Sequence, residues 1–222
     1  MYLETILPLF PLNVVLMPEM PLPLHIFEER YKTMIRECLA EDKEFGIVYI
    51  SGDELRQVGC TAQIVKVLQS YEGGEMDIIT LGRNRFFIEE VYDRKSYFEA
   101  KIVHFDDVPE EESGELLMLA RKGIESLREL DRIIGIPRDY EELKYLGPKP
   151  VSFLVSGSEG LPLEEKQELL EMTSTRGRLK SGLRSLQKVL EATRINKESP
   201  ENRENRRGDG NLREILEKYG LD

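Results

Sequence analysis

The sequence predicts an α+β fold in which a β-rich barrel comes first and a small helical bundle follows. Up to about residue 105, apolar residues alternate with polar ones or form short runs between turn signals, which is typical of strands. Beyond that point apolar residues recur every three to four positions, which is typical of amphipathic helices. Several short strands at near-regular spacing favour a closed or nearly closed small barrel.

The N-terminal segment 7–31 is the most specific feature of the chain. It carries five prolines among leucines, valines and phenylalanines: Pro8, Pro11, Pro18, Pro21 and Pro23. Proline cannot occupy a helix interior and removes a donor from a strand ladder, so we expect edge strands or polyproline-like stretches. The apolar side chains of this segment require burial, which makes it part of the core.

The rest of the β-rich part contains one helix and four further strands. Helical spacing joins Tyr31, Met34, Ile35, Cys38 and Leu39, and strands are expected at 47–50, 58–68, 76–88 and 97–105. Gly59 indicates a bulge or a close backbone approach in its strand. A hairpin loop is expected at 72–75, and residues 82–85 interrupt the third of these strands.

The acidic, turn-rich segment 106–114 separates the strands from the helices. Apolar stripes predict helices at 116–134, 140–146, 151–155, 163–171 and 179–190, the first of which ends at Gly135-Ile136-Pro137. Residues 196–211 have nothing to bury, which predicts a disordered linker, and helical spacing after it predicts a short helix. The expected organisation is a β-rich part at 1–105, a helical part at 106–195, a linker at 196–211 and a helix at 212–222.

Several motifs occur in a familiar order along the chain. They are Leu7-Pro8-Leu9-Phe10-Pro11-Leu12, Leu22-Pro23-Leu24-His25-Ile26-Phe27-Glu28-Glu29-Arg30-Tyr31, Val58-Gly59-Cys60, Gly82 with Arg85-Phe86, and Lys166-Gln167-Glu168-Leu169-Leu170-Glu171. In this order and spacing they resemble the N-terminal substrate-recognition domain of the ATP-dependent protease Lon, over about residues 3–190. The His-Ile-Phe-Glu-Glu-Arg-Tyr sequence is most similar to free-standing versions of that domain.

The resemblance implies a PUA-like pseudobarrel that carries a helical subdomain. In Lon this region contacts unfolded or tagged substrate polypeptide, and ATPase and protease units follow it. This sequence shows no such units after residue 190, so we expect a free-standing, non-enzymatic module. The expected partners are unfolded or tagged polypeptide and a protease or chaperone, which fits an adaptor in protein quality control or proteolysis.

Five residues are candidates for polypeptide contact. Met17, Met20 and Phe27 could remain exposed on the proline-rich segment, where methionine suits promiscuous binding. Arg83 and Arg85 beside the Gly82 turn could grip a carboxylate. The alternatives are that the apolar residues of the segment seal the barrel, and that both arginines are solvated or pair with Glu89 or Glu90.

Two patterns suggest catalysis, and neither meets the requirements of its chemistry. The six residues from Gly177 to Gly182 have the glycine spacing of a phosphate loop, but the lysine, the hydroxyl residue and the preceding strand are missing. Ser185 and Lys188 could form a serine–lysine pair, yet they lie opposite the leucine stripe, where water keeps lysine charged. We therefore predict no catalytic residues.

We also predict no metal site and no cofactor. Two histidines, His25 and His104, could bind a metal only with stray carboxylates, and a lone histidine more often packs while it satisfies a backbone carbonyl. Cys38 and Cys60 have no Cys-x-x-Cys spacing, so a zinc site or a disulfide framework is not expected. Cys38 falls on the apolar helix face and reads as a small buried hydrophobe.

The net charge of −11 disfavours partners that are themselves anionic, namely nucleic acids and anionic membrane surfaces. The sequence has neither a leader peptide nor an apolar run near the ~20 residues of a membrane span, so a cytoplasmic location is expected. Two other functions stay open, a cryptic hydrolase and a PUA-like RNA-binding protein. The sequence determines neither the client nor the oligomeric state.

Overall fold

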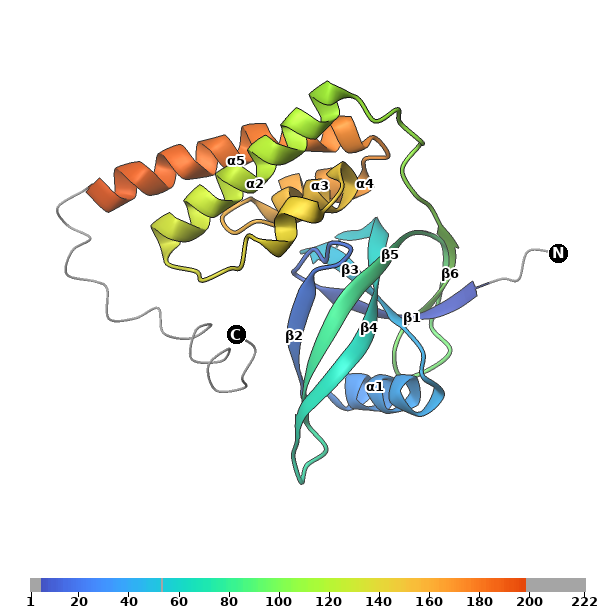
Figure 1. Ribbon diagram of the computed structural model, residues 1–222. Coiled ribbons are helices and arrows are strands. Elements are labelled where there is room, and N and C mark those ends of the chain that lie inside the picture. Colours follow the sequence, from blue (N-terminus) through green and yellow to red (C-terminus); the bar gives the residue numbers. More distant parts are fainter. Residues whose placement is uncertain (1–4, 53, 199–222) are drawn as a thin grey trace.

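The computed structural model describes residues 5–52 and 54–198 of the chain. Residues 5–104 form the barrel and residues 114–198 form the helical part, which lies against one end of the barrel (Figure 1). Helix α1 (Glu29–Glu41) belongs to the barrel and lies at its opposite end (Figure 1). This is the α+β fold that the sequence predicts.

The described strands close into a barrel. They are β1 (Thr5–Leu12), β2 (Pro21–Ile26), β3 (Phe45–Ser51), β4 (Glu54–Ser70), β5 (Met76–Tyr92) and β6 (Glu99–His104). Their order is β2-β5-β4-β3-β1-β6, and β5 also pairs with β6, so five strands form a ring and β2 extends it. Strand β5 makes this possible because its first half pairs with β2 and its second half with β6.

The prolines of β1 are tolerated although β1 is not an edge strand. Residues 5–8 of β1 pair with β6 alone, and residues 9–12 pair with β3 alone. Each half of β1 therefore has one unpaired side, and each half contains one proline, Pro8 or Pro11. The expectation of an edge strand is wrong for β1 as a whole, because β1 has a partner strand on each side. Each proline nevertheless lies where one side of the strand is unpaired, so its missing N–H costs no ladder hydrogen bond.

Strand β2 is the edge strand of the sheet. The Gly82 N–H donates to the Met20 carbonyl, and the alternation of an antiparallel pair then directs the backbone groups of Leu22 toward β5 and those of Pro21 and Pro23 away from it. The Leu22 carbonyl also accepts from the Thr80 hydroxyl. Prolines have no N–H, and the free edge of β2 therefore offers few donors to a further strand. An edge of this kind resists the addition of another strand.

Gly82 marks a bulge in β5 and not a break between strands. Four residues of β5, from Gly82 to Arg85, lie opposite three residues of β4, from Cys60 to Ala62, so β5 has one extra residue here. The turn at Met17–Met20 lies directly on Gly82: Glu19 donates its N–H to the Gly82 carbonyl (2.9 Å), and Gly82 donates to the Met20 carbonyl (3.0 Å). A Cβ atom at Gly82 would lie 2.1 Å from the Met17 carbonyl oxygen. Only glycine permits this approach.

The helical part consists of α2 (Gly114–Ile134), the short 3₁₀ helix η1 (Glu142–Tyr145), α3 (Pro148–Ser156), α4 (Leu163–Glu171) and α5 (Thr175–Glu198). Helix α2 begins at Ser113, whose hydroxyl accepts from the Leu116 N–H, and ends at Gly135, whose φ is 84°. Helix α5 is longer than predicted and includes residues 196–198 of the expected linker. The rest of that linker and the expected final helix lie outside the described residues.

Buried apolar residues of the barrel and of the helical part form separate cores, and a smaller cluster joins them. The barrel core includes Phe10, Met34 and Cys38, and the helical core centres on α2, α3 and α5. Between them, Val15, Met17, Tyr49, Phe153 and Leu170 form the junction cluster. Burial raises the pKa of the Cys38 thiol to about 11, which agrees with its expected role as a small hydrophobe. None of the helices in residues 5–52 and 54–198 is long and apolar enough to span a membrane.

We predict that Gly82→Ala lowers the free energy of unfolding by about 1–3 kcal/mol, because its Cβ would collide with the backbone of the Met17–Met20 turn. Gly114→Ala is the matched control, since nothing lies within 4 Å of a Cβ at Gly114. It should be neutral or stabilise by up to about 1 kcal/mol. Urea denaturation of both variants measures this, and equal effects would contradict the close approach.

Candidate functional site

A groove of about 860 Å³ lies where the helical part meets the barrel. The Met17–Met20 turn, the β5 bulge and the end of β6 line it on the barrel side, and η1 and α3 line it on the helical side. Its lining combines apolar side chains with basic, acidic and other polar ones. The lining residues are Pro18, Glu19, Arg83, Asn84, Arg85, His104, Phe105, Asp106, Leu143, Leu146, Lys149, Pro150, Phe153 and Leu154.

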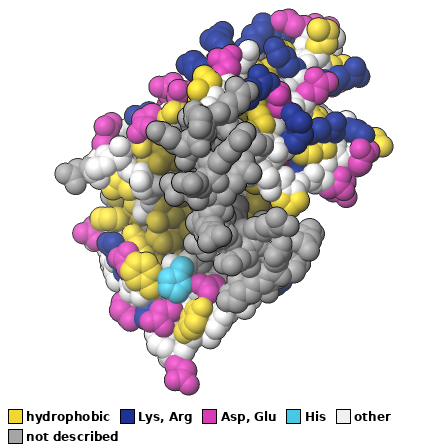
Figure 2. Space-filling model, turned by 90° about the vertical axis from the view of Figure 1, so that its left-hand side faces the viewer, with side chains coloured by type: hydrophobic (Ala, Val, Ile, Leu, Met, Phe, Trp, Pro, Cys, Tyr) yellow, Lys and Arg dark blue, Asp and Glu magenta, His cyan; other side chains and the backbone are white. Residues whose placement is uncertain are grey.

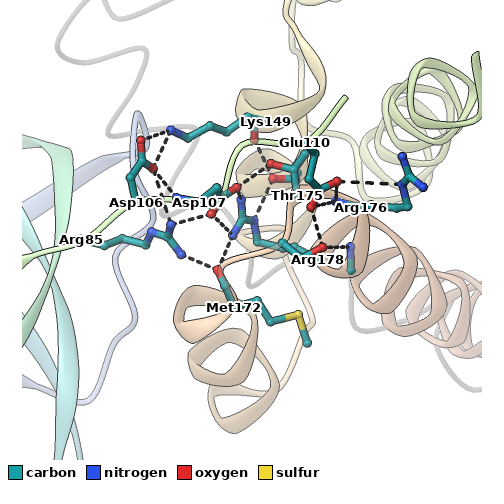
Figure 3. A network of polar contacts seen from close by, with 12 residues as sticks. Arg85, Asp106, Asp107, Glu110, Lys149, Met172, Thr175, Arg176 and Arg178 are labelled. Atoms are coloured by element: carbon teal, nitrogen blue, oxygen red, sulfur yellow. Dashed lines mark hydrogen bonds and ion pairs between the residues drawn. The ribbon is translucent and has the colours of Figure 1, made fainter. Parts of the chain in front are cut away.

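A buried cluster of two arginines and one aspartate joins the two sides of the groove (Figure 3). Arg85 reaches from the β5 bulge and donates to the backbone carbonyls of Leu170 (2.9 Å) and Met172 (2.5 Å). It also donates to Asp107 in the segment between barrel and helices, at 2.5 Å. The Arg85 guanidinium lies over the rings of Phe105 and Phe153, which shield it from water.

Arg178 of α5 completes this cluster from the helical side. Its guanidinium donates to both carboxylate oxygens of Asp107, to the Met172 carbonyl (2.7 Å) and to the Ser152 hydroxyl (2.8 Å). Its guanidinium carbon lies 3.8 Å from the centre of the Phe153 ring. Two buried cations thus share one carboxylate, and they also donate to backbone carbonyls and a hydroxyl.

The environment of Asp107 favours its ionised form. Burial by itself would raise the pKa of this carboxyl, whose side chain is 6% exposed. Hydrogen bonds from Arg178 and Thr175 and the charges of Arg178 and Arg85 outweigh that effect, so the pKa of Asp107 is lowered. For Arg85, burial disfavours the charged guanidinium and lowers its pKa, and the nearby charge of Asp107 offsets part of this effect.

Further ion pairs surround the cluster near the surface (Figure 3). Lys149 of α3 pairs with Asp106 at 2.6 Å, and Glu110 accepts from the Ser174 hydroxyl (2.6 Å) and from the Arg176 N–H. These contacts hold the segment 106–110 against the start of α5. Because Asp106 is exposed, its pair with Lys149 contributes far less to stability than the buried cluster.

Arg83 lies in the groove and is held differently from Arg85. Its Nε and one terminal nitrogen donate to the side-chain carbonyl of Gln63, at 2.9 and 2.5 Å. Its other terminal nitrogen lies 3.8 Å from the carboxylate of Glu19, which is an ion pair beyond hydrogen-bond distance. The side chain is 34% exposed, so a ligand in the groove can reach it.

The structure corrects two of the predicted contact residues. Met17 is 1% exposed because it packs in the junction cluster, and Arg85 is buried in the arginine–aspartate cluster. Neither side chain is accessible to a polypeptide. The alternative pairing with Glu89 or Glu90 is also wrong, since Arg83 pairs with Glu19 and Arg85 with Asp107. Solvation, the other alternative, holds in part for Arg83, whose side chain is 34% exposed.

Met20 and Phe27 have different surroundings. Met20 is half-buried, next to the end of α3, where its methyl group would lie 3.0 Å from a Cβ at Gly157. Phe27 is 61% exposed just after β2, with its ring 5.9 Å from that of His25. His25 is exposed and bonds the Asp77 carboxylate (2.7 Å), so the expectation of a packed histidine bonded to a carbonyl is wrong.

The residues considered for catalysis lie in a helix, and the histidines considered for metal binding lie at the surface. Residues 177–182 lie within helix α5, Ser185 donates its hydroxyl to Glu165, and Lys188 is exposed. His104 is exposed at the groove. In the described part of the chain, no group of three or more histidine, cysteine or acidic side chains is placed to hold a metal ion.

Sequence reasoning missed Asp107, Arg178 and the leucines of the groove. Asp107 reads as one of many acids in a boundary segment, and nothing local distinguishes it. Arg178 offers one signal: it lies three residues after Thr175 and one before Leu179, on the buried face of α5. An arginine at a buried helix position requires a partner, and that rule could have identified it.

Charge is unevenly distributed over the surface. On the face in Figure 2, lysine and arginine side chains gather on the upper, helical part, and hydrophobic side chains gather in the shaded region between it and the barrel. Helix α5 belongs to this part, and from 175 to 195 it has five basic residues at least partly exposed and one acidic residue, since its sixth basic residue, Arg178, is buried. The chain is acidic overall, so this is a local basic surface.

Comparisons with known proteins converge on one family. The family model described as "ATP-dependent protease La (LON) substrate-binding domain" matches residues 6–188. A "Lon protease 2" from Myxococcus xanthus is 27% identical over 208 residues, which cover 86% of this chain and 24% of that protein. A Lon protease from Flavobacterium johnsoniae is 28% identical over 202 residues, covering 83% of this chain and again 24% of the relative.

Two solved structures share the fold. A Lon N-terminal domain protein from Xanthomonas campestris has a TM-score of 0.63 at 23% identity and covers 81% of this chain and 98% of its own. The N-terminal domain of the Lon protease of the Mycobacterium avium complex has a TM-score of 0.64 at 20% identity, with 82% and 98% covered. At these identities the likeness concerns the fold, and the chain spans about a quarter of the curated relatives it matches.

We predict that Asp107→Asn lowers the free energy of unfolding by about 3–5 kcal/mol, because two buried guanidinium groups lose their counter-charge. The control is Asp106→Asn, which removes the neighbouring exposed carboxylate and should cost at most about 1 kcal/mol. Chemical denaturation measures both. Similar losses in the two variants would contradict a special role of Asp107.

The lowered pKa of Asp107 also predicts a pH dependence. The folded protein keeps Asp107 ionised where the unfolded chain already binds a proton, so its stabilisation is complete above the unfolded pKa of about 3.9. It is lost as pH falls through the folded pKa. The stability difference between the native protein and Asp107→Asn should therefore be full near neutral pH and shrink as pH falls below the unfolded pKa of about 3.9. A pH-independent difference would contradict this assignment.

Proposed function

Because the chain belongs to the ATP-dependent protease La (LON) substrate-binding domain family, we propose that it binds segments of unfolded or tagged polypeptide in the groove between barrel and helical part. The groove itself carries the proposal. Its volume of about 860 Å³ is within the range of about 300–1,000 Å³ that is typical of ligand sites. Half of its lining residues are apolar, which suits short apolar stretches that an unfolded chain exposes.

The edge of the sheet is a poor site for polypeptide, and this favours the groove as the binding site. Polypeptides commonly bind to sheets as an added strand, through main-chain hydrogen bonds. The free edge of β2 has prolines at positions 21 and 23, where an added strand would need N–H donors. A bound polypeptide therefore depends on side-chain contacts, which the groove supplies from Leu143, Leu146 and Leu154.

Phe27 is proposed as a second contact for polypeptide. It is exposed, its ring lies beside that of His25, and His25 in turn lies beside Tyr71. A large exposed aromatic side chain of this kind is common at protein interfaces. Phe27 does not line the groove, so the two contacts can be tested separately.

The matched relatives are proteases, and this chain matches only about a quarter of their length. We propose for it the recognition step alone, as a module that binds polypeptide and presents it to a protease or chaperone. No catalytic step is assigned to it. This agrees with Ser185 and Lys188, which lie apart from the groove in α5.

We predict that Leu146→Glu raises the Kd for fluorescein-labelled β-casein, an unfolded polypeptide, by about fivefold or more, as measured by fluorescence anisotropy. Leu146 lines the groove and is 38% exposed, so its replacement should leave the fold intact. Val67→Glu is the matched control: Val67 is 39% exposed on β4, outside the groove, and its variant should bind normally.

Phe27→Ser separates the second contact from the groove. We expect a smaller loss of affinity for this variant than for Leu146→Glu. If Phe27→Ser abolishes binding and Leu146→Glu does not, the groove is not the main site. If the native protein does not bind β-casein at all, the proposed function itself is wrong.

A further inference from the structure

We propose that the groove selects polypeptides that carry a carboxylate next to apolar side chains, and that Arg83 is the residue that recognises this carboxylate. In the free protein Glu19 is the ion-pair partner of Arg83, and it would compete with the carboxylate of a bound polypeptide. This inference rests on the proposed polypeptide-binding function and gives it a substrate class. Its evidence is how the basic side chains of the groove are paired.

Arg83 is held in place by the amide of Gln63. Two of its nitrogens donate to the Gln63 side-chain carbonyl, which fixes the guanidinium plane. The remaining terminal nitrogen has no acceptor within hydrogen-bond distance among the described residues, and its ion pair is with Glu19, which lines the groove together with Arg83. A guanidinium that is already ordered loses little entropy when it binds a carboxylate, so it is well suited to recognise one.

The other basic side chains in the groove are engaged. Arg85 is buried and bonds Asp107 and two carbonyls, and Lys149 pairs with Asp106 at 2.6 Å. Among the lysines and arginines that line the groove, Arg83 therefore has the longest ion pair, at 3.8 Å. It is the basic group that a ligand can reach without breaking a short hydrogen bond.

Glu19 is poorly placed to satisfy Arg83. Its carboxylate is beyond hydrogen-bond distance from the guanidinium and 61% exposed, so water screens the pair. Its backbone is fixed instead, with φ at 62° and the N–H bonded to the Gly82 carbonyl. The side chain can therefore swing away when a stronger carboxylate arrives, while the turn that carries it stays in place.

Apolar groups lie on the same groove surface as Arg83. Pro18 and Phe105 come from the barrel side, and Phe153 and Leu154 come from α3. A ligand carboxylate on Arg83 would therefore be flanked by side chains that bury apolar surface. Excluding water from this pair strengthens it over a fully exposed one. The substrate class that fits is an acidic residue within an apolar stretch.

The test uses two fluorescein-labelled peptides with the same apolar residues, one with a central Glu and one with Gln in its place. Anisotropy should show that the native protein binds the Glu peptide about fivefold more tightly than the Gln peptide. Arg83→Gln should remove this preference by weakening the Glu peptide alone. Glu19→Gln should increase the preference, because it removes the competing carboxylate.

Two further variants control for net charge. Lys66→Gln removes one positive charge and Glu72→Gln one negative charge at exposed barrel positions outside the groove. Both should keep the native preference. If Lys66→Gln reduces the preference as much as Arg83→Gln, or if the native protein binds both peptides equally, recognition by Arg83 is overturned while polypeptide binding stands. If neither peptide binds, the proposed function falls together with this inference.

Discussion

The buried carboxylate of Asp107 is the interaction on which the rest of the structure depends. It binds Arg85 from β5 and Arg178 from α5, and it lies in the segment between the barrel and the helices. One side chain therefore ties three parts of the chain together. Because all its partners are buried, the cluster cannot be weakened by water, and removing one member leaves the others without compensation.

The groove follows from this attachment. Its two sides belong to different parts of the chain, and the arginine–aspartate cluster fixes the distance between them. The two arginines of the β5 bulge make different contacts: Arg85 bonds the helical part, and Arg83 lines the groove. Gly82 begins the bulge and holds the Met17–Met20 turn, so the same few residues shape the groove and one of its rims.

This arrangement suits recognition better than chemistry. Arg85, Arg178 and Asp107 satisfy one another in the buried cluster. The groove combines apolar side chains with polar ones, among which Arg83 is loosely paired. Such a surface can bind short apolar stretches of different sequence through side-chain contacts. Membership of the LON substrate-binding family agrees with that use.

The sequence alone determined the α+β class, the change from strands to helices near residue 106, the end of α2 at Gly135 and the close approach at Gly59. These depend on periodicity, proline and glycine, whose effects reach only a few residues along the chain. The pairing of Arg85 and Arg178 with Asp107, 22 and 71 residues away, was decided by the tertiary structure. So was the burial of Met17, which the Gly82 bulge turns toward α3. Contacts of this length exist only once the barrel closes through β5 and β6 and the helices settle on its end, and no local pattern records them.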